Sequence, residues 1–205
     1  MNIAAIKQHL QAQERRVLEL PDFRQAAVLV AITLEPEPSL ILTQRTAHLS
    51  RHSGQIAFAG GSLEVGETAT QAALREAHEE IGLEPSCVEV LGLLGDVWTP
   101  VGFHVTPVLG VVSASAQFLP NTGEVARLLF VPLADLRQMT PTFELKILPA
   151  SARVPDFESR ERAVPHLLWQ DTDIWGMTAF VILGLLELLE LNASGLNKLA
   201  LVQPA

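Results

Sequence analysis

Blocks of apolar and polar residues along the chain predict a series of strands separated by turns. Two apolar, β-branched runs, Ala26–Thr33 and Leu40–Arg45, flank the turn-like segment Glu35–Ser39, and this pattern predicts a hairpin of two strands. The other predicted strands are Gln55–Ala59, Val88–Val97 and Thr106–Val112, with a loop at Trp98–Gly102 between the last two. We expect these segments to form one mixed sheet.

A helix is predicted after the third of these strands. From Thr68 to Ile81 there is no Gly or Pro, Ala and Leu are frequent, and Gly82 stands where a helix would end. At about 100° per residue, three apolar residues share one stripe: Leu74, Ala77 and Ile81. Three acids share another side of the cylinder: Glu76, Glu79 and Glu80.

The two ends of the chain are also predicted to be helical. Met1–Leu20 contains charged residues among helix formers and has no apolar core, so we expect an exposed amphipathic helix rather than a secretory signal. Ile174–Leu191 is long and apolar enough for a membrane span, but Glu187, Glu190 and two glycines weaken that interpretation. A helix buried in the protein is the better prediction.

These elements predict an α/β fold. The mixed sheet would be covered by the Glu-rich helix on one face and by the C-terminal helix on the other, with loops at residues 113–123 and 149–165. We divide the chain into an N-terminal helix or extension at 1–22, a main domain at 23–192 and a C-terminal tail at 193–205.

The net charge and the cysteine count limit the kinds of molecule that the protein is expected to bind and the compartment it suits. The chain has 205 residues and a formal net charge of −9, and an acidic surface repels nucleic acid and anionic lipid. We therefore expect neither a nucleic-acid nor a membrane partner, and any phosphate-bearing molecule would have to be attracted by a local positive patch or a bound cation. Cys87 is the only cysteine, which excludes an intramolecular disulfide and suits a reducing compartment, so we expect a cytoplasmic location. We expect Cys87 to be an ordinary small residue rather than a catalytic thiol.

The three acids of the predicted helix indicate a cation site. Like charges spaced three and four residues apart repel each other, and a divalent cation such as Mg²⁺ would offset that repulsion. The main-chain carbonyl of Gly60 can join such a site, and Arg75 lies four residues before Glu79, close enough to orient its carboxylate. The alternative is a solvated acidic helix face.

The spacing of the whole segment Gly61–Leu83 favours the cation site. It runs Gly, five residues, Glu, seven residues, Arg-Glu, two residues, Glu-Glu, one residue and Gly-Leu, and it resembles the Nudix box at every defined position. The weakest match is the small Ala77. The resemblance implies a Nudix-type α/β/α sandwich with a loop-helix-loop catalytic box. It also implies hydrolysis of a nucleoside diphosphate linked to another group, with Mg²⁺ or Mn²⁺.

The resemblance assigns roles to individual residues. Glu76 and Glu80 become the expected metal ligands, with Glu79 as an additional ligand, and the Gly60 carbonyl suggested by the Gly-Gly backbone would join them. Arg75 and Glu67 would organise them. For the group that accepts the proton of the attacking water, the family uses either a glutamate of the box or a carboxylate from a later loop. Our candidate from a later loop is Glu124; the alternative is that Glu124 is a surface acid at the start of a strand.

A second motif lies just upstream. The segment 42–61 resembles the motif of the coenzyme A pyrophosphatase branch of the Nudix family, through its Leu-Thr-x-Arg start, its Gly-Gln pair and its double Gly. It departs from that motif at Ala59, where Pro is usual, and at Ser50, where Arg is frequent. The resemblance implies that the substrate is coenzyme A or a derivative of it.

Positive charge is concentrated in the same segment. Arg45 and Arg51, with His48 or His52, can recognise the phosphates of coenzyme A, although each alone is equally well explained as an exposed charge. Two other function classes stay open. The box alone fits an enzyme acting on ADP-ribose, NADH or a nucleoside triphosphate, and some domains of this kind only bind nucleotides.

Overall fold

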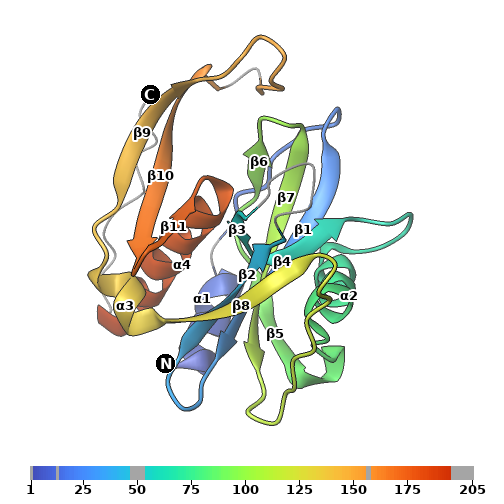
Figure 1. The fold of residues 1–205 in the computed structure, drawn as a ribbon, viewed down its shortest axis with the longest axis vertical. Coiled ribbons are helices and arrows are strands. Elements are labelled where there is room, and N and C mark those ends of the chain that lie inside the picture. Colours follow the sequence, from blue (N-terminus) through green and yellow to red (C-terminus); the bar gives the residue numbers. More distant parts are fainter. Residues whose placement is uncertain (1, 13, 47–53, 156–157, 195–205) are drawn as a thin grey trace.

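The larger of two sheets forms the centre of the molecule (Figure 1). The computed structural model describes the chain except for residues 1, 13, 47–53, 156–157 and 195–205. Within the described residues the larger sheet has eight strands: β1 (Arg24–Thr33), β2 (Ser39–Arg45), β3 (Ile56–Ala57), β4 (Ala59–Ser62), β5 (Val88–Leu93), β6 (Val97–Thr99), β7 (Phe103–Val112) and β8 (Val125–Pro132).

This sheet is mixed, as the sequence predicts. Strands β1 and β7 run parallel, whereas the other pairs are antiparallel, in the order β3-β2-β1-β7-β5. Strand β4 also pairs with β1, β6 with β7, and β8 with β2. The predicted hairpin of β1 and β2 is confirmed by the pairing of Ile32 with Leu40. The α/β fold class is therefore confirmed.

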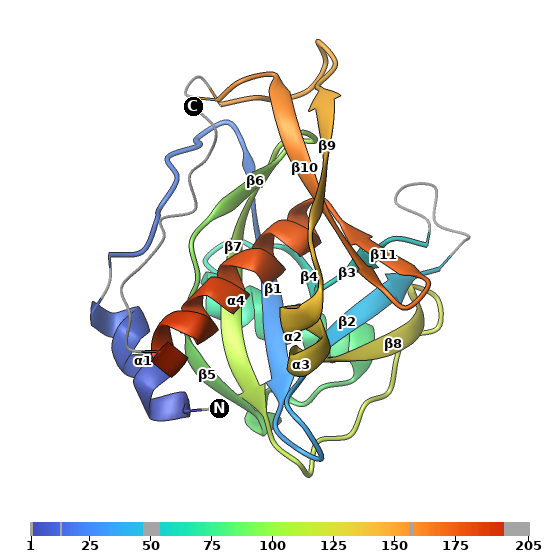
Figure 2. The same ribbon diagram turned by 90° about the vertical axis from the view of Figure 1, so that its left-hand side faces the viewer.

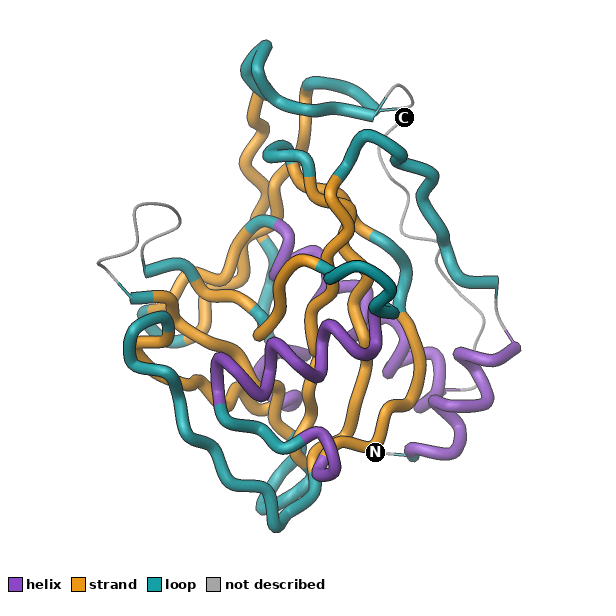
Figure 3. The backbone as a smooth tube through the Cα atoms, turned by 90° about the vertical axis from the view of Figure 1, so that its right-hand side faces the viewer, coloured by secondary structure: helices purple, strands orange, loops and turns teal. Residues whose placement is uncertain are grey.

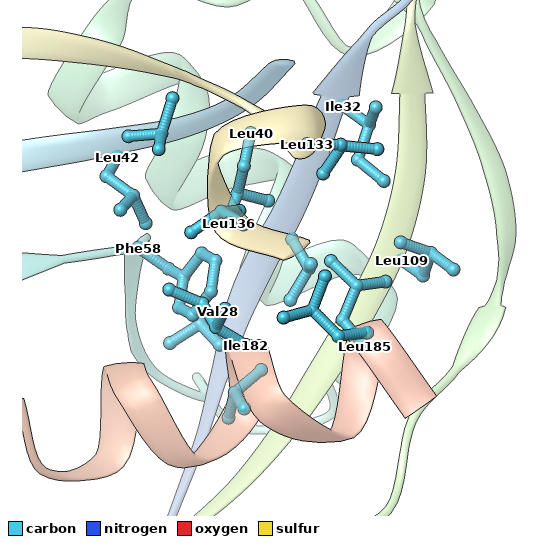
Figure 4. Packing of buried hydrophobic residues seen from close by; sticks show 14 of the residues in the cluster. Val28, Ile32, Leu40, Leu42, Phe58, Leu109, Leu133, Leu136, Ile182 and Leu185 are labelled. Atoms are coloured by element: carbon cyan, nitrogen blue, oxygen red, sulfur yellow. The ribbon is translucent and has the colours of Figure 1, made fainter. Parts of the chain in front are cut away.

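Strand β1 contributes to two separate hydrophobic cores. Val28 and its alternate neighbours pack with Ile182 and Leu185 of helix α4 (Met177–Ser194), as Figure 4 shows. Leu29 and its alternate neighbours pack on the opposite face with Ala77 of helix α2 (Ala69–Ile81). Helix α4 lies in front of the sheet in Figure 2 and α2 lies in front of it in the opposite view of Figure 3, which confirms the predicted sandwich.

Helix α2 begins and ends where its sequence predicts. Thr68 and Gln71 form a capping box, in which the Thr68 hydroxyl accepts the Gln71 amide at 3.3 Å and the Gln71 side chain accepts the Thr68 amide at 2.9 Å. Gly82 ends the helix at φ 65°, a left-handed conformation that favours glycine. The buried stripe differs in one respect from the prediction, because Ala73 is fully buried where Leu74 was expected and Leu74 is only half-buried.

The N-terminal helix is shorter than predicted, and the C-terminal helix has the predicted length but begins three residues later. Helix α1 (Ile3–Ala12) packs on β5 and α4 through Ile6, which is 1% exposed, so it is not the fully exposed helix expected over Met1–Leu20. Helix α4 is buried, as predicted, but Ile174 precedes it in a strand. No helix in the described parts of the chain is long and apolar enough to cross a membrane.

A second, three-stranded sheet was not predicted. Its antiparallel strands lie in the order β11-β10-β9: β9 (Thr142–Ile147), β10 (Glu161–Trp169) and β11 (Thr172–Trp175). The prediction of a loop over 149–165 is therefore wrong from Glu161 onward, because that end pairs with β9. Helix α3 (Leu133–Gln138) and strand β8 were also missed. The predicted loop at 113–123 contains no helix or strand.

The predicted strand Val88–Val97 is broken in two. Strand β5 ends at Leu93, and β6 then extends to Thr99, so Trp98 lies in a strand rather than in the expected loop. The break falls at Asp96, whose side chain is 1% exposed and accepts the backbone amide of Leu18. Pairing of Asp96 with a distant segment explains the interruption.

Candidate active site

Two acids of α2, Glu76 and Glu80, lie against strand β4. A Cβ atom placed on Gly61 would lie 2.4 Å from Oε1 of Glu76, closer than real Cβ contacts allow. Glycine at position 61 therefore leaves the space that the Glu76 carboxylate occupies.

Arg75 is the centre of an ion-pair network. Its guanidinium donates to both carboxylate oxygens of Glu67, at 2.9 and 3.0 Å, and to Oε1 of Glu76 at 2.8 Å. It also donates to the Ser62 carbonyl at 3.1 Å and lies 3.6 Å from Glu79. The hydrogen bonds that Arg75 donates to Glu67 and Glu76 raise the pKa of Arg75, and the bonds to Glu67 lower the pKa of Glu67. Arg75 thus fixes Glu76 more closely than Glu79, the partner that its spacing predicts.

Glu80 is the buried acid of the site. It is 6% exposed and accepts the Gly60 amide at 3.3 Å, and Arg45 Nη1 lies 3.8 Å from its Oε1. Burial raises the pKa of Glu80 to about 7, and the charges of Glu76 and Glu124 add to that rise while Gly60 and Arg45 oppose it. Its negative charge is therefore only partly compensated by the protein.

Glu124 lies next to this acid. Asn121, in the same turn, donates its amide to the Glu80 carbonyl at 2.9 Å, and Thr46 donates its amide to the Glu124 carbonyl at 2.9 Å. These backbone bonds hold the turn against the C-terminal end of α2. The Glu124 side chain is exposed and close enough to act on the pKa of Glu80.

A cavity of about 470 Å³ opens beside the acids. Arg45, Gly60 and Gly61 line one part of it, and residues of the three-stranded sheet line another. This volume lies within the range of small-molecule sites. The position of Arg45 is thus between the buried acid and the cavity.

Three candidate residues lie outside the described part of the chain: His48, Arg51 and His52. Their predicted contact with substrate phosphates stays a prediction. Cys87 is a free, half-buried residue packed beside the core of α2, away from the residues that line the cavity.

Comparison with known proteins identifies the family. The NUDIX domain model matches residues 23–151. The chain belongs to the Nudix family. It is 40% identical over 161 residues to the protein named uncharacterized Nudix hydrolase NudL of Pectobacterium atrosepticum, covering 78% of this chain and 79% of that one. It is 37% identical over 169 residues to the protein of the same name from Escherichia coli K12, covering 80% and 82%. The crystal structure of the Nudix hydrolase RenU of M. smegmatis is 28% identical and covers 56% of this chain and 73% of that chain, with a TM-score of 0.48.

Nudix hydrolases act on pyrophosphate bonds in small nucleotide-derived molecules and generally use divalent cations. The donor set here fits such a cation, because a buried carboxylate with two acidic neighbours carries excess negative charge in a poorly solvated place. Within the described residues no three His, Cys, Asp or Glu side chains already meet as a metal cluster. Glu76 is turned toward Arg75 and Glu79 is 58% exposed.

Several residues at the site were not predicted from the sequence. Gly60 contributes its amide to Glu80, whereas the sequence suggested its carbonyl as a metal ligand. Lys146, Arg162 and Trp175 line the cavity although they lie on the unpredicted sheet.

Proposed function

We propose that the protein is a metal-dependent pyrophosphatase that hydrolyses coenzyme A, or a derivative of it, to adenosine 3′,5′-bisphosphate and 4′-phosphopantetheine. The observation that carries the proposal is the buried, partly compensated Glu80, which lies beside Glu76 and Glu124 and faces Arg45 at the cavity. The upstream motif around Arg45 favours coenzyme A over other pyrophosphates.

In this proposal Glu76, Glu79 and Glu80 hold Mg²⁺ or Mn²⁺, together with the Gly60 carbonyl. Such a cation neutralises charge that develops on the pyrophosphate and lowers the pKa of the attacking water. Arg75 and Glu67 keep the Glu76 carboxylate in place through the bonds described above.

The chain supplies the remaining groups. Arg45 contacts a pyrophosphate oxygen, with Arg51 and His52 as further proposed phosphate contacts. Glu124 accepts a proton from water, whose oxygen forms the new bond to phosphorus while the bridging oxygen leaves with the other phosphate. Glu79 and Glu76 are the alternative acceptors, because the box itself supplies the base in part of the family.

We also propose that the hydrolase domain spans 23–192 rather than ending with the family match at residue 151. Strands β10 and β11 and helix α4 all lie beyond that match, and α4 packs on the same core as β1. The preceding residues 1–22 add helix α1 as an extension. A cytoplasmic location is our inference from the single cysteine.

The test compares substrates side by side. Purified protein is incubated with coenzyme A, ADP-ribose, NADH and dGTP, each with Mg²⁺, with Mn²⁺ or with EDTA, and products are identified by mass. We expect cation-dependent release of adenosine 3′,5′-bisphosphate, fastest with coenzyme A. Faster cleavage of another substrate would remove the coenzyme A assignment and leave the Nudix chemistry in place. Binding of all four without any cleavage would instead indicate a nucleotide-binding domain.

A further inference from the structure

Two cationic side chains lie opposite each other on the neighbouring strands β9 and β10. Arg162 of β10 is the direct cross-strand partner of Lys146 of β9, and both line the cavity that reaches Gly60 and Gly61. Like charges directly opposite each other in an antiparallel pair are destabilising. The pair therefore lowers the stability of the hairpin unless an anion lies between or above the two side chains.

Each cation is backed by an aromatic ring. The Arg162 guanidinium carbon lies 4.2 Å from the centroid of the Trp98 ring, and the Lys146 ammonium lies 5.0 Å from that of Trp175. Trp98 is 3% exposed, so its ring is fixed by packing. A guanidinium stacked in this way is oriented before a ligand arrives and keeps N–H groups at its edge for an anion.

Arg162 has little compensation for its charge. Burial lowers the pKa of Arg162; the charge of Glu158 opposes that shift and the charge of Arg16 adds to it. Among the described residues Arg162 forms no ion pair, and the hydrogen bond it donates goes to the Trp98 carbonyl at 3.5 Å. Arg75, by contrast, binds two carboxylates.

Lys146 is less available than Arg162 to bind an anion. Its ammonium lies 2.9 Å from Glu144, an exposed carboxylate on the same strand. An incoming anion would have to share Lys146 with that acid. Arg162 is therefore the main anion-binding group of the pair and Lys146 its assistant.

We propose that Arg162, assisted by Lys146, binds a phosphate monoester of the substrate, and that the β9–β10 hairpin thereby selects coenzyme A over analogues without a 3′-phosphate. This inference rests on the proposed function, since the cavity lined by Lys146 and Arg162 is also lined by Gly60 and Arg45, which contact Glu80. Coenzyme A carries a pyrophosphate and a separate 3′-phosphate, so its recognition needs two anion sites. Arg45 lies at one part of the cavity and Arg162 at the other. Figure 1 shows β9 and β10 beside the end of the main sheet that carries β6.

The test measures binding without relying on hydrolysis. Isothermal titration calorimetry in Mg²⁺ buffer compares adenosine 3′,5′-bisphosphate with adenosine 5′-monophosphate, which lacks only the phosphate in question. We expect the wild type to bind the bisphosphate roughly 10- to 100-fold more tightly, the range for charge-assisted hydrogen bonds. Arg162→Met should bring that ratio within about threefold of one, and Lys146→Met should lower it by about threefold. Arg137→Met, which removes an exposed cation of α3, is the matched control and should leave the ratio unchanged.

Equal binding of both nucleotides by the wild type would overturn the proposal. So would an Arg162→Met protein that loses affinity for both nucleotides to the same extent, because that result describes a structural role. If circular dichroism shows that Arg162→Met does not fold, the ratio in Lys146→Met decides: a severalfold fall supports the site and an unchanged ratio overturns it.

Hydrolysis gives an independent readout. Wild type and Arg162→Met are compared on coenzyme A and on 3′-dephospho-coenzyme A, and we expect kcat/KM to fall for the first substrate only. If neither substrate is cleaved but ADP-ribose is, the proposed function fails, whereas the binding ratio still decides whether Arg162 recognises a phosphate monoester.

Discussion

Glu80 and Asp96 are both buried carboxylates, 6% and 1% exposed, yet their surroundings differ in kind. Asp96 accepts the Leu18 amide at 3.1 Å and the Thr106 hydroxyl at 2.9 Å, and Arg15 also donates to it. Nε2 of His104 lies 2.8 Å from its Oδ2. Glu80 has one amide donor, at 3.3 Å, and a guanidinium at 3.8 Å.

The two pKa values move in opposite directions. Burial by itself raises the pKa of Asp96, but His104, Leu18, Thr106 and Arg15 outweigh burial and lower it. Around Glu80 burial prevails and the pKa rises to about 7. Asp96 is thus an acid whose partners are already in place, and it ties the segment before β1 to the sheet. Glu80 is an acid whose charge is only partly compensated by Gly60 and Arg45, which is the condition expected of a ligand for a cation.

The largest predicted effect comes from removing the charge of Glu80. We expect Glu80→Gln to lower kcat by roughly 100-fold or more, because a cation ligand is lost while shape is kept. The variant should unfold at the same temperature as the wild type or higher. Glu84→Gln, an exposed acid just beyond the same helix, is the matched control for activity assays. Full activity of Glu80→Gln at saturating Mg²⁺ would contradict the ligand assignment.

Removing the charge of Asp96 should lower the stability of the protein and leave its activity unchanged, the reverse of the effect expected at Glu80. Asp96→Asn removes the negative charge beside Arg15 and His104 and replaces one acceptor oxygen by an NH2 group, and we expect a loss of about 3 kcal/mol in the free energy of unfolding. Activity per folded molecule should stay near the wild-type value. Urea titration followed by circular dichroism measures the first quantity, and Asp22→Asn is an exposed control. A stable but inactive Asp96→Asn would remove the distinction between the two acids.

The pH dependence of stability should separate the acids further. In cation-free protein Glu80 holds its proton up to a pKa of about 7 when folded but only up to about 4.5 when unfolded, so stability falls as pH rises through that window. Asp96 has the opposite effect on stability, because its pKa is lower in the folded protein than in the unfolded chain. It stabilises the fold above the unfolded pKa, and this stabilisation is lost as pH falls through the lower, folded pKa. Glu80→Gln should therefore gain up to about 3 kcal/mol on the wild type between pH 5 and 8. A pH-independent difference would contradict the raised pKa of Glu80.

The smallest predicted effect is stabilisation by the cation. Mg²⁺ at ten times its Kd should add about 1.4 kcal/mol to the free energy of unfolding of the wild type at pH 8. It should add much less to Glu80→Gln, and Asp96→Asn should respond as the wild type does. Thermal denaturation with and without EDTA measures the difference. Equal stabilisation of all three proteins would place the cation away from Glu80.

Local sequence signals predicted the part of the site that lies on one helix. The caps at Thr68 and Gly82 and the spacing of the acids are properties of consecutive residues, and helix α2 formed with nearly the predicted ends. Which acid is buried did not follow from spacing. Glu80 is buried because Gly60 and the turn at Asn121 pack against it, and these are 20 and 41 residues away in the sequence.

Long-range pairing explains the elements that were missed. Strand β10 pairs with β9 across a segment rich in Pro and Ser, and no local pattern in Glu161–Pro165 reveals that partner. The contacts of Asp96 reach two other segments, one with Arg15 and Leu18 and one with His104 and Thr106. The sequence around Asp96 alone therefore gave no signal that this acid would be buried. The predicted strand through Val97 failed for the same reason.

Strand β1 is covered on both faces and has neighbours on both edges, with β2 and β4 on one side and β7 on the other. Opening of a single helix would uncover only one of its faces and would leave its ladder intact. The interior amides of β1 should therefore exchange their hydrogens with solvent only when the whole domain unfolds. Their exchange rates would report the global free energy of unfolding at each pH, from inside the strand on which the sandwich is built.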